Sequence, residues 1–235
     1  MVLAMDGIPS LVAMYLLFVF STTCHEAAHA FVAQRGGDDT ASAHGHVTLD
    51  PMPHIMRSPW GMVIAPLIGL YTMGWPLGWA SVPYDPRWAQ RYPLRSSLMS
   101  LAGPFANFSL AFGSLALLRV LIETGVYHLL GTGVRSGFVF LNEGVASNSP
   151  LAALAFLLSR LVYLNLLLGA FNLIPFPPLD GAGVLEGLSP RGIGSLYARL
   201  REIPASQFIG WIAASQLFPY LYRPIEHLIV LGLGF

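Results

Sequence analysis

The sequence contains no lysine and a single cysteine, Cys24, and only 10% of its 235 residues are charged. One cysteine excludes an intrachain disulfide and a metal site built from clustered cysteines. An average soluble domain is about 25% charged, so this chain lacks the polar residues that would cover a soluble protein. Its net charge of zero argues against a nucleic-acid partner, because neutralising phosphates requires a basic surface. Rossmann, P-loop and protein-kinase motifs are also absent.

Apolar residues dominate instead: they make up 54% of the chain, and the mean hydropathy is +0.61. Residues 11–34, 59–80, 97–118 and 151–174 are apolar stretches with the roughly 20 residues needed to cross a bilayer core of about 30 Å. A fifth region, residues 208–235, is interrupted by Pro219 and Pro224, so it predicts either one kinked span or a short span with an interfacial helix. The first ten residues include Asp6 and no basic residue, unlike a secretory signal. We therefore expect an integral membrane protein.

The first apolar stretch contains the run His25-Glu26-Ala27-Ala28-His29. Histidines at positions i and i+4 lie on one helix face and are able to reach one zinc ion. Glu26 is placed to take a proton from a zinc-bound water. His25 lies about 21 Å along the helix from the start of the stretch, and unpaired ionisable groups in the hydrocarbon cost about 2.5 kcal/mol or more each. The run therefore predicts a divalent metal ion, whereas the simpler alternative is a polar cluster that bonds neighbouring helices.

A catalytic zinc takes three protein ligands and leaves one position open. Asp180 is the best candidate for the third ligand, because it follows the fourth apolar stretch at the end of the run Pro175-Phe-Pro-Pro-Leu-Asp180-Gly181. The prolines hold the chain extended, and Gly181 permits a sharp turn beside the ligand. Taken alone, such an Asp-Gly pair is more often only a turn.

HEAAH, then Leu101-Ala-Gly-Pro-Phe-Ala-Asn107, then the run from Asn172 to Gly181 follow in this order, each beside an apolar stretch. This combination resembles the site-2 protease family of intramembrane zinc metalloproteases, over roughly residues 10–190. The resemblance implies that His25, His29 and Asp180 hold one zinc ion per chain and that Glu26 is the catalytic base. It further implies transmembrane or membrane-anchored protein substrates, cut within or next to their spans. Ala182-Gly183 departs from the frequent Gly-Arg of the family, and PDZ and CBS modules are absent.

Asn172, eight residues before Asp180, is our candidate for a catalytic amide that donates to the oxyanion. An interhelical hydrogen bond is an equally good interpretation of this residue. We expect Asn107 to bond to a neighbouring helix near the site. His44, His46 and His54 are available as spare metal ligands or pH-sensitive groups, although solvated or hydrogen-bonded loop histidines are the more common case.

The predicted fold is an all-α polytopic membrane protein, a bundle of about 4–6 transmembrane helices with a small β-hairpin or re-entrant segment near the active site. Residues 44–50 alternate polar and apolar side chains, which is typical of a strand or hairpin. Residues 59–80 are broken by prolines and glycines, so we expect them to re-enter without crossing. We expect residues 1–235 to form a single domain, with a core at 10–190 and C-terminal helices at 206–235.

For His25, His29 and Asp180 to share one ion, the chain between them must cross the membrane an odd number of times. A re-entrant 59–80 satisfies this and leaves eight arginines on the side of the metal site, Arg35, Arg57, Arg87, Arg91, Arg95, Arg191, Arg199 and Arg201, against Arg119 and Arg135 on the other. Cytoplasmic loops carry the excess of basic residues. We therefore expect the site to face the cytoplasmic half of a membrane, by resemblance the prokaryotic inner membrane.

Three other functions are weighed against the protease. A catalytically silent adaptor that binds transmembrane helices has no need of the base Glu26. A transporter with a metal site at a broken helix predicts inverted repeats, which the sequence lacks. An unrelated HExxH membrane peptidase normally takes its third ligand from a downstream Glu or His on a helix, not from a proline-rich Leu-Asp-Gly turn.

Overall fold

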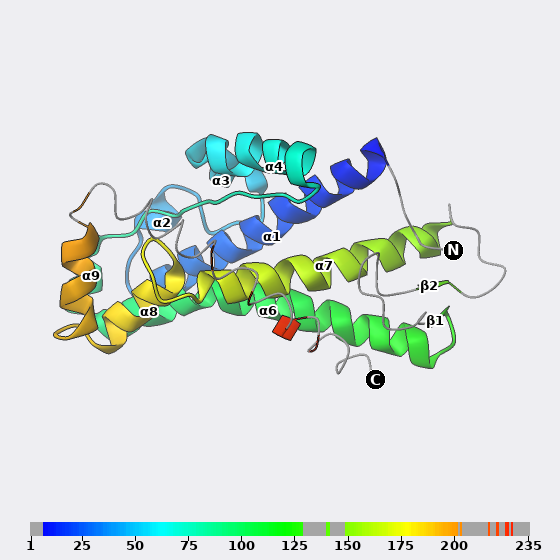
Figure 1. The fold of residues 1–235 in the computed structure, drawn as a ribbon. Helices are drawn as coiled ribbons and strands as arrows, with labels where there is room; N and C mark the ends of the chain where they lie inside the picture. Colours follow the sequence, from blue (N-terminus) through cyan, green and yellow to red (C-terminus); the bar gives the residue numbers. More distant parts are fainter. Residues whose placement is uncertain are drawn as a thin grey trace.

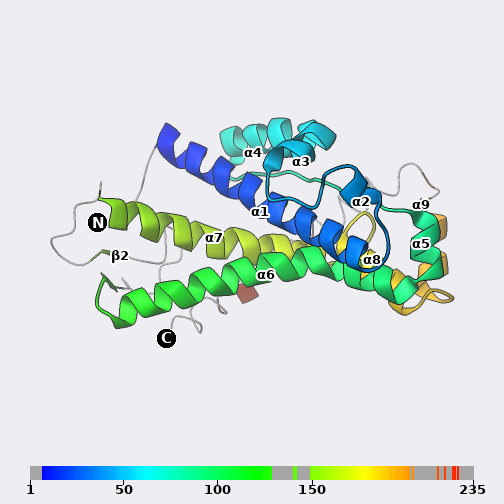
Figure 2. The same ribbon diagram turned by 180° about the vertical axis from the view of Figure 1, so that it is seen from behind.

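In the computed structural model, the described residues are 7–128, 140–141, 149–201, 203, 216, 220, 224–225 and 227. The C-terminal helices expected at 206–235 fall outside the continuous part of this range. Three long helices dominate the described chain: α1 (Ile8–Arg35), α6 (Pro93–Glu123) and α7 (Pro150–Asn172). Helices α6 and α7 run side by side and α1 crosses against them (Figures 1 and 2). All three are long and apolar enough to span a membrane, so the all-α membrane fold is confirmed.

Three of the described helices begin where the sequence offers a side-chain cap. The Ser149 side chain accepts a hydrogen bond from Ala152 N–H at the start of α7, and Pro150 takes the first helical position. Asp50 caps α3 (Pro51–Arg57) and Asp85 caps α5 (Pro86–Arg91) in the same way. A proline fits the first turn because its missing N–H has no partner there in any case, so cap and proline together determine where each helix starts.

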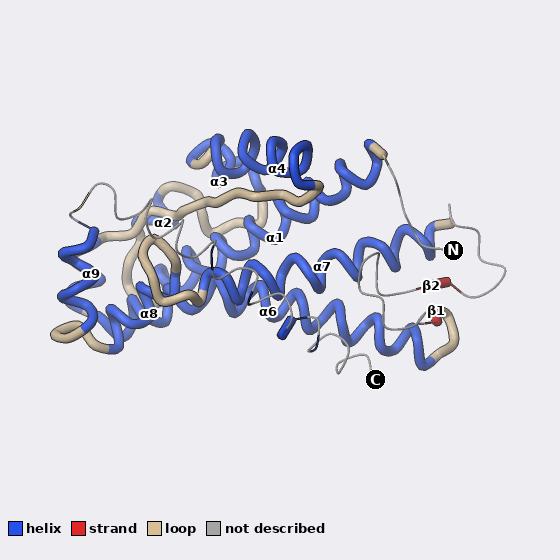
Figure 3. Tube along the Cα trace, in the orientation of Figure 1, coloured by secondary structure: helices blue, strands red, loops and turns tan. Residues whose placement is uncertain are grey.

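Residues 59–80 do not form a spanning helix. A π-helical turn, η1 (Trp60–Ile64), leads into α4 (Ala65–Met73), which ends at Gly74 in the left-handed region at φ 68°. The chain then returns as an irregular segment alongside α4 (Figure 3), and Trp79 N–H donates to the Gly61 carbonyl at 3.1 Å. Both ends of the segment therefore lie together, which agrees with the expected re-entrant course.

The prediction of a β-hairpin at residues 44–50 is wrong. This stretch consists of turns and bends between α2 (Thr40–Ala43) and α3. His46 N–H donates to the Ala41 carbonyl at 3.0 Å, which closes a turn, and the Asp50 cap with Pro51 commits the following residues to a helix. The two strands of the described chain, β1 (Tyr127–His128) and β2 (Phe140–Leu141), pair near the end of α6 and the start of α7, away from the HEAAH run (Figure 3).

Helix α8 (Asp180–Leu188) packs against α6 and is followed by α9 (Ile193–Arg201). The contact depends on two glycines one helix turn apart: a Cβ on Gly183 would collide with Ser100, and one on Gly187 would collide with the Pro93 carbonyl. Ser97 Oγ donates to the Val184 carbonyl at 2.8 Å across the same contact. This close packing holds α8, whose first residue is Asp180, against α6.

The core lies between the long helices and joins side chains from α6 and α7, among them Leu115, Leu118, Leu158, Val162 and Leu166. The outer surface is apolar too, and Phe105 and Phe112 on α6 are 70% and 53% exposed. Exposed aromatic residues on a long apolar helix suit a surface covered by lipid. The chain is an integral membrane protein.

Candidate metal centre

Three possible ligands from two distant parts of the chain meet at one point. His25 and His29 lie on the same face of α1, and their Nε2 atoms are 3.0 Å apart. Asp180, at the start of α8, places its two carboxylate oxygens 3.0 Å from His25 Nε2 and 3.3 Å from His29 Nε2. Both histidines are buried. Among the histidine, cysteine and acidic side chains of the described residues, His25, His29 and Asp180 form the group that lies close enough together to hold a metal ion.

The Nδ1 atoms of both rings are committed to protein acceptors. His25 Nδ1 lies 2.6 Å from the side-chain oxygen of Asn107, and His29 Nδ1 lies 2.6 Å from the backbone carbonyl of Met99. Since a carbonyl oxygen only accepts, each Nδ1 carries the proton and donates. Each Nε2 is then left with a lone pair directed at the other ring and at Asp180.

This donor set fits a zinc ion. Two Nε2 lone pairs and a carboxylate that face one another at about 3 Å repel unless a cation lies among them. Two imidazoles and one carboxylate are ligands that zinc uses in catalytic sites, where a fourth position stays open. Partners that orient the ligating rings through Nδ1 are typical of zinc-binding histidines.

Helix α6 closes one side of the site through Gly103. A Cβ at this position would collide with the Nε2 atoms of both His25 and His29. Only a glycine therefore lets α6 approach the two rings closely, which in turn brings Met99 and Asn107, one turn to either side, within hydrogen-bond distance of them.

Glu26 and Asn172 border the same cavity of about 720 Å³, together with His25 and Asp180. Glu26 is buried, and its Oε2 has no hydrogen-bond partner among the described residues. Asn172 is partly buried and donates one N–H to the Leu168 carbonyl of its own helix at 2.9 Å. This hydrogen bond is therefore intrahelical rather than interhelical. It uses one N–H of the Asn172 amide, and the second N–H does not bond to Leu168.

The three histidines of residues 44–54 do not join this group. His44 is exposed, and its Nδ1 donates to the Thr40 carbonyl at 2.7 Å. His46 and His54 are buried with ring centroids 5.2 Å apart, so neither is solvated. His54 Nε2 lies 3.2 Å from the Thr48 carbonyl, which agrees with the hydrogen-bonded alternative for this residue. Burial lowers the pKa of His46, and the neighbouring His54, Arg57 and His44 lower it further.

Sequence reasoning found the proposed ligands but missed most of what supports them. The Met99 carbonyl is a backbone group and carries no sequence signal. Asn165 is fully buried in α7 and accepts a hydrogen bond from Asn107 at 2.8 Å. An asparagine within the apolar residues 161–170 of α7 was a signal that pointed to a buried polar contact.

A helical HExxH pair that meets a carboxylate between membrane-spanning helices defines a membrane metallopeptidase. The chain belongs to peptidase family M50, the site-2 protease family, whose family model matches residues 13–203. It is therefore a membrane zinc metalloprotease, and zinc is its cofactor.

Curated relatives agree with this membership. The chain is 34% identical over 181 residues to the Bacillus subtilis protein named "Putative zinc metalloprotease YwhC", which covers 76% of this chain and 69% of that protein. It is 32% identical over 204 residues to the Mycobacterium tuberculosis protein named "Putative zinc metalloprotease Rip2", covering 83% of this chain and 67% of that protein. No solved structure gives a significant match.

Proposed function

We propose that the protein hydrolyses peptide bonds within or next to the transmembrane segments of membrane proteins, with His25, His29 and Asp180 as zinc ligands and Glu26 as the catalytic base. One observation carries the proposal: the three ligand atoms lie within 4.8 Å of one another beside a carboxylate oxygen that has no partner in the described chain. Helices of membrane-spanning length surround them. A buried carboxylate without a partner is costly, and groups held at such a cost are typical of functional sites.

When bound, zinc supplies Lewis acidity, which acidifies a water molecule and polarises a scissile carbonyl. Glu26 Oε2 accepts the proton of the attacking water and afterwards returns it to the leaving amine. Asn172 uses its uncommitted N–H to donate to the oxygen of the scissile carbonyl as negative charge develops there. His25 and His29 keep their Nδ1 protons throughout, so their Nε2 lone pairs stay directed at the metal position.

The lining of the cavity is consistent with a substrate that enters from the membrane. Leu168 and Phe171 of α7 contribute an apolar wall, and the returning segment contributes Trp79, Ala80 and Ser81. An extended peptide has space beside Glu26 there, whereas an intact helix would be held away from it by its own side chains. We therefore propose that the substrate's helix unwinds locally before cleavage.

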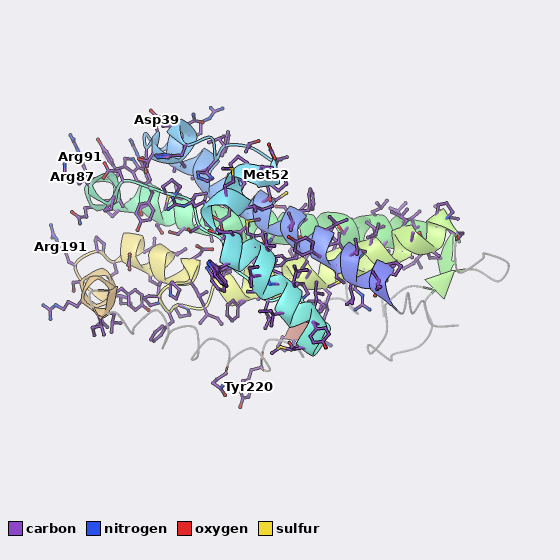
Figure 4. All side chains as sticks on the ribbon, turned by 90° about the horizontal axis from the view of Figure 1, so that it is seen from above. Asp39, Met52, Arg87, Arg91, Arg191 and Tyr220 are labelled. Carbon is purple, nitrogen blue, oxygen red and sulfur yellow. The ribbon has the colours of Figure 1, made fainter. Side chains whose placement is uncertain are left out.

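Charge distribution supports an orientation with the site toward the cytoplasmic half of a prokaryotic inner membrane. Arg87, Arg91 and Arg191 lie at one end of the molecule, on α5 and just before α9 (Figure 4). Helix α8, which begins at Asp180, and the C-terminal end of α1 lie toward this same end (Figure 1). Basic loop residues favour the cytoplasmic side.

Two measurements test the proposal, the first on the purified, detergent-solubilised protein and the second in host membranes. Mass spectrometry is expected to find about one zinc per wild-type chain, and none in His25→Ala or Asp180→Asn. Glu26→Gln is the matched control, because it keeps the three ligands and is expected to keep the zinc. Folded wild-type protein without zinc would contradict the metal site.

Cleavage is then measured by mapping new amino-termini in host membranes that contain each variant. Wild type is expected to create termini within or next to transmembrane segments, and Glu26→Gln is expected to create none, since loss of a general base costs about 10²–10⁴ in rate. Identical termini with both proteins would contradict the role of Glu26. Zinc binding without cleavage by wild type would favour an adaptor that binds transmembrane helices.

A further inference from the structure

A chain of buried polar side chains connects the site to the backbone of α7. From His25 Nδ1 it runs to the Asn107 oxygen at 2.6 Å, and from Asn107 Nδ2 to the Asn165 oxygen at 2.8 Å. Asn165 Nδ2 in turn donates to Ser21 Oγ and to the Leu161 carbonyl, both at 2.9 Å. The three long helices each contribute to it, and both asparagines are fully buried.

The far end of this chain determines its direction. The Leu161 carbonyl is a backbone oxygen that only accepts, so the NH₂ side of the Asn165 amide has to face it. The oxygen of the Asn165 amide then faces Asn107, so Asn107 has to donate to it through its own NH₂ group. The Asn107 oxygen is thereby turned toward His25, and Nδ1 of that ring has to carry the proton.

His29 has no need of such a chain, because its Nδ1 donates directly to a backbone carbonyl, that of Met99. The partner of His25 is instead an amide, which offers a donor or an acceptor depending on how it is turned. If the Asn107 amide were reversed, it would donate to Nδ1 and force the proton onto Nε2, where it would compete with a metal.

We infer that Asn165, assisted by Ser21, is a positioning residue for the metal site: through Asn107 it holds His25 in the tautomer whose Nε2 binds zinc. The inference rests on the proposed role of His25 as a zinc ligand. It explains why α7 buries an asparagine in an apolar segment, where an unsatisfied amide would be costly. Both N–H groups and the oxygen of Asn165 are used, so the burial is compensated only when the whole chain is formed.

Asn165→Leu tests the inference, because leucine has the same branched arrangement of side-chain heavy atoms and neither donates nor accepts. Zinc affinity of the purified protein, measured by competition with a chelator, is expected to fall about tenfold or more, as for other residues that orient a metal ligand. The visible spectrum of the cobalt-substituted variant is expected to change as well, since it reports the geometry of the ligands. The matched control is Ser159→Ala, which removes a buried hydroxyl on the same helix that bonds only to the Ala155 carbonyl.

Ser21→Ala is a second, milder variant that decides the matter if Asn165→Leu does not fold. It removes one of the two acceptors of Asn165 and leaves the Leu161 carbonyl, so its zinc affinity is expected to fall by less than in Asn165→Leu but by more than in Ser159→Ala. Zinc affinity and cobalt spectra of both test variants equal to those of Ser159→Ala would overturn the inference while leaving the zinc site intact. Wild-type protein without zinc would instead overturn the proposed function.

Discussion

At the scale of single residues, the site depends on which nitrogen of each imidazole carries its proton. His25 and His29 both donate through Nδ1, to Asn107 and Met99, and both direct Nε2 at Asp180. Glu26 differs, because its Oε2 is buried without a partner in the described chain. The residues proposed to bind metal are thus oriented by hydrogen bonds, while the proposed base remains available for a proton.

Asn172→Ala is predicted to lower kcat about 10²–10³-fold with little change in KM, because an oxyanion donor acts mainly in the transition state. Zinc content is expected to stay at the wild-type level, since the Asn172 amide donates to the Leu168 carbonyl of its own helix and does not position a ligand. The rates are measured with a substrate identified from the mapped termini. An unchanged kcat would leave Asn172 a structural residue of α7.

His46 makes stability depend on pH. Burial and the charges of His54, Arg57 and His44 lower the pKa of His46 in the folded protein, whereas the unfolded chain binds this proton below about pH 6.5. Between that pH and the lower folded pKa the unfolded state holds more protons, so stability falls as the pH falls. The melting temperature of wild type is predicted to drop between pH 7.5 and 5.5, and His46→Gln is predicted to show a smaller drop.

The control for this measurement is His44→Gln, which changes an exposed histidine of the same segment. It is expected to follow the wild-type pH dependence. If His46→Gln and His44→Gln shift the melting curve equally at both pH values, the burial of His46 does not govern the pH dependence.

At the scale of elements, contacts through glycine decide where α6 lies. Gly103 brings α6 against the two imidazoles, and Gly183 and Gly187 bring α8 against α6. Prolines then limit where helices begin, as at Pro150 of α7. The site therefore results from three helices that approach closely at positions without side chains.

Gly103→Ala is predicted to abolish zinc binding, because its Cβ would collide with both Nε2 atoms and the rings would have to turn away. Gly113→Ala is the matched control on the same helix, since a Cβ there meets no atom within 4 Å. It is expected to retain zinc and to gain about 0.5–1 kcal/mol of helix stability. Zinc content of the two variants is measured side by side, and equal zinc in both would show that α6 is able to move away from the rings.

At the scale of the whole molecule, the proposed re-entrant course of residues 59–80 concerns which ends meet. If these residues crossed completely, every later segment would change sides. Asp180 would then lie on the side opposite to His25 and His29, and the ten counted arginines would divide four against six. Instead the segment turns back at Gly74, and Trp79 returns to Gly61. His25, His29 and Asp180 are then able to approach from the same side of the membrane.

Cysteine labelling measures this topology. In a Cys24→Ala background, Gln90→Cys and Leu130→Cys are predicted to react from opposite sides of sealed vesicles with a reagent that does not cross the bilayer. Residue 90 is expected on the side of the metal site. Labelling of both positions from one side would show that our assignment of the crossings is wrong.

The sequence alone determined the class of the protein and the proposed ligands. Low charge and long apolar stretches require a membrane, and HEAAH brings two histidines to one helix face by helical geometry alone. The proline-rich turn before Asp180 supplied the third candidate ligand. These conclusions were accessible because each depends on composition or on contacts within a few residues of the chain.

Only the tertiary structure decided what surrounds those ligands. The hairpin expected at 44–50 is replaced by turns and α3, because the Asp50 cap and Pro51 outweigh the alternating pattern. Asn107 and the Met99 carbonyl lie far from His25 and His29 in the sequence and meet them only when α1 and α6 pack together. Asn165 reaches Asn107 only when α7 packs against α6. A local pattern specifies which side chains are able to bind a metal, but the directions of their hydrogen bonds depend on which helices become neighbours.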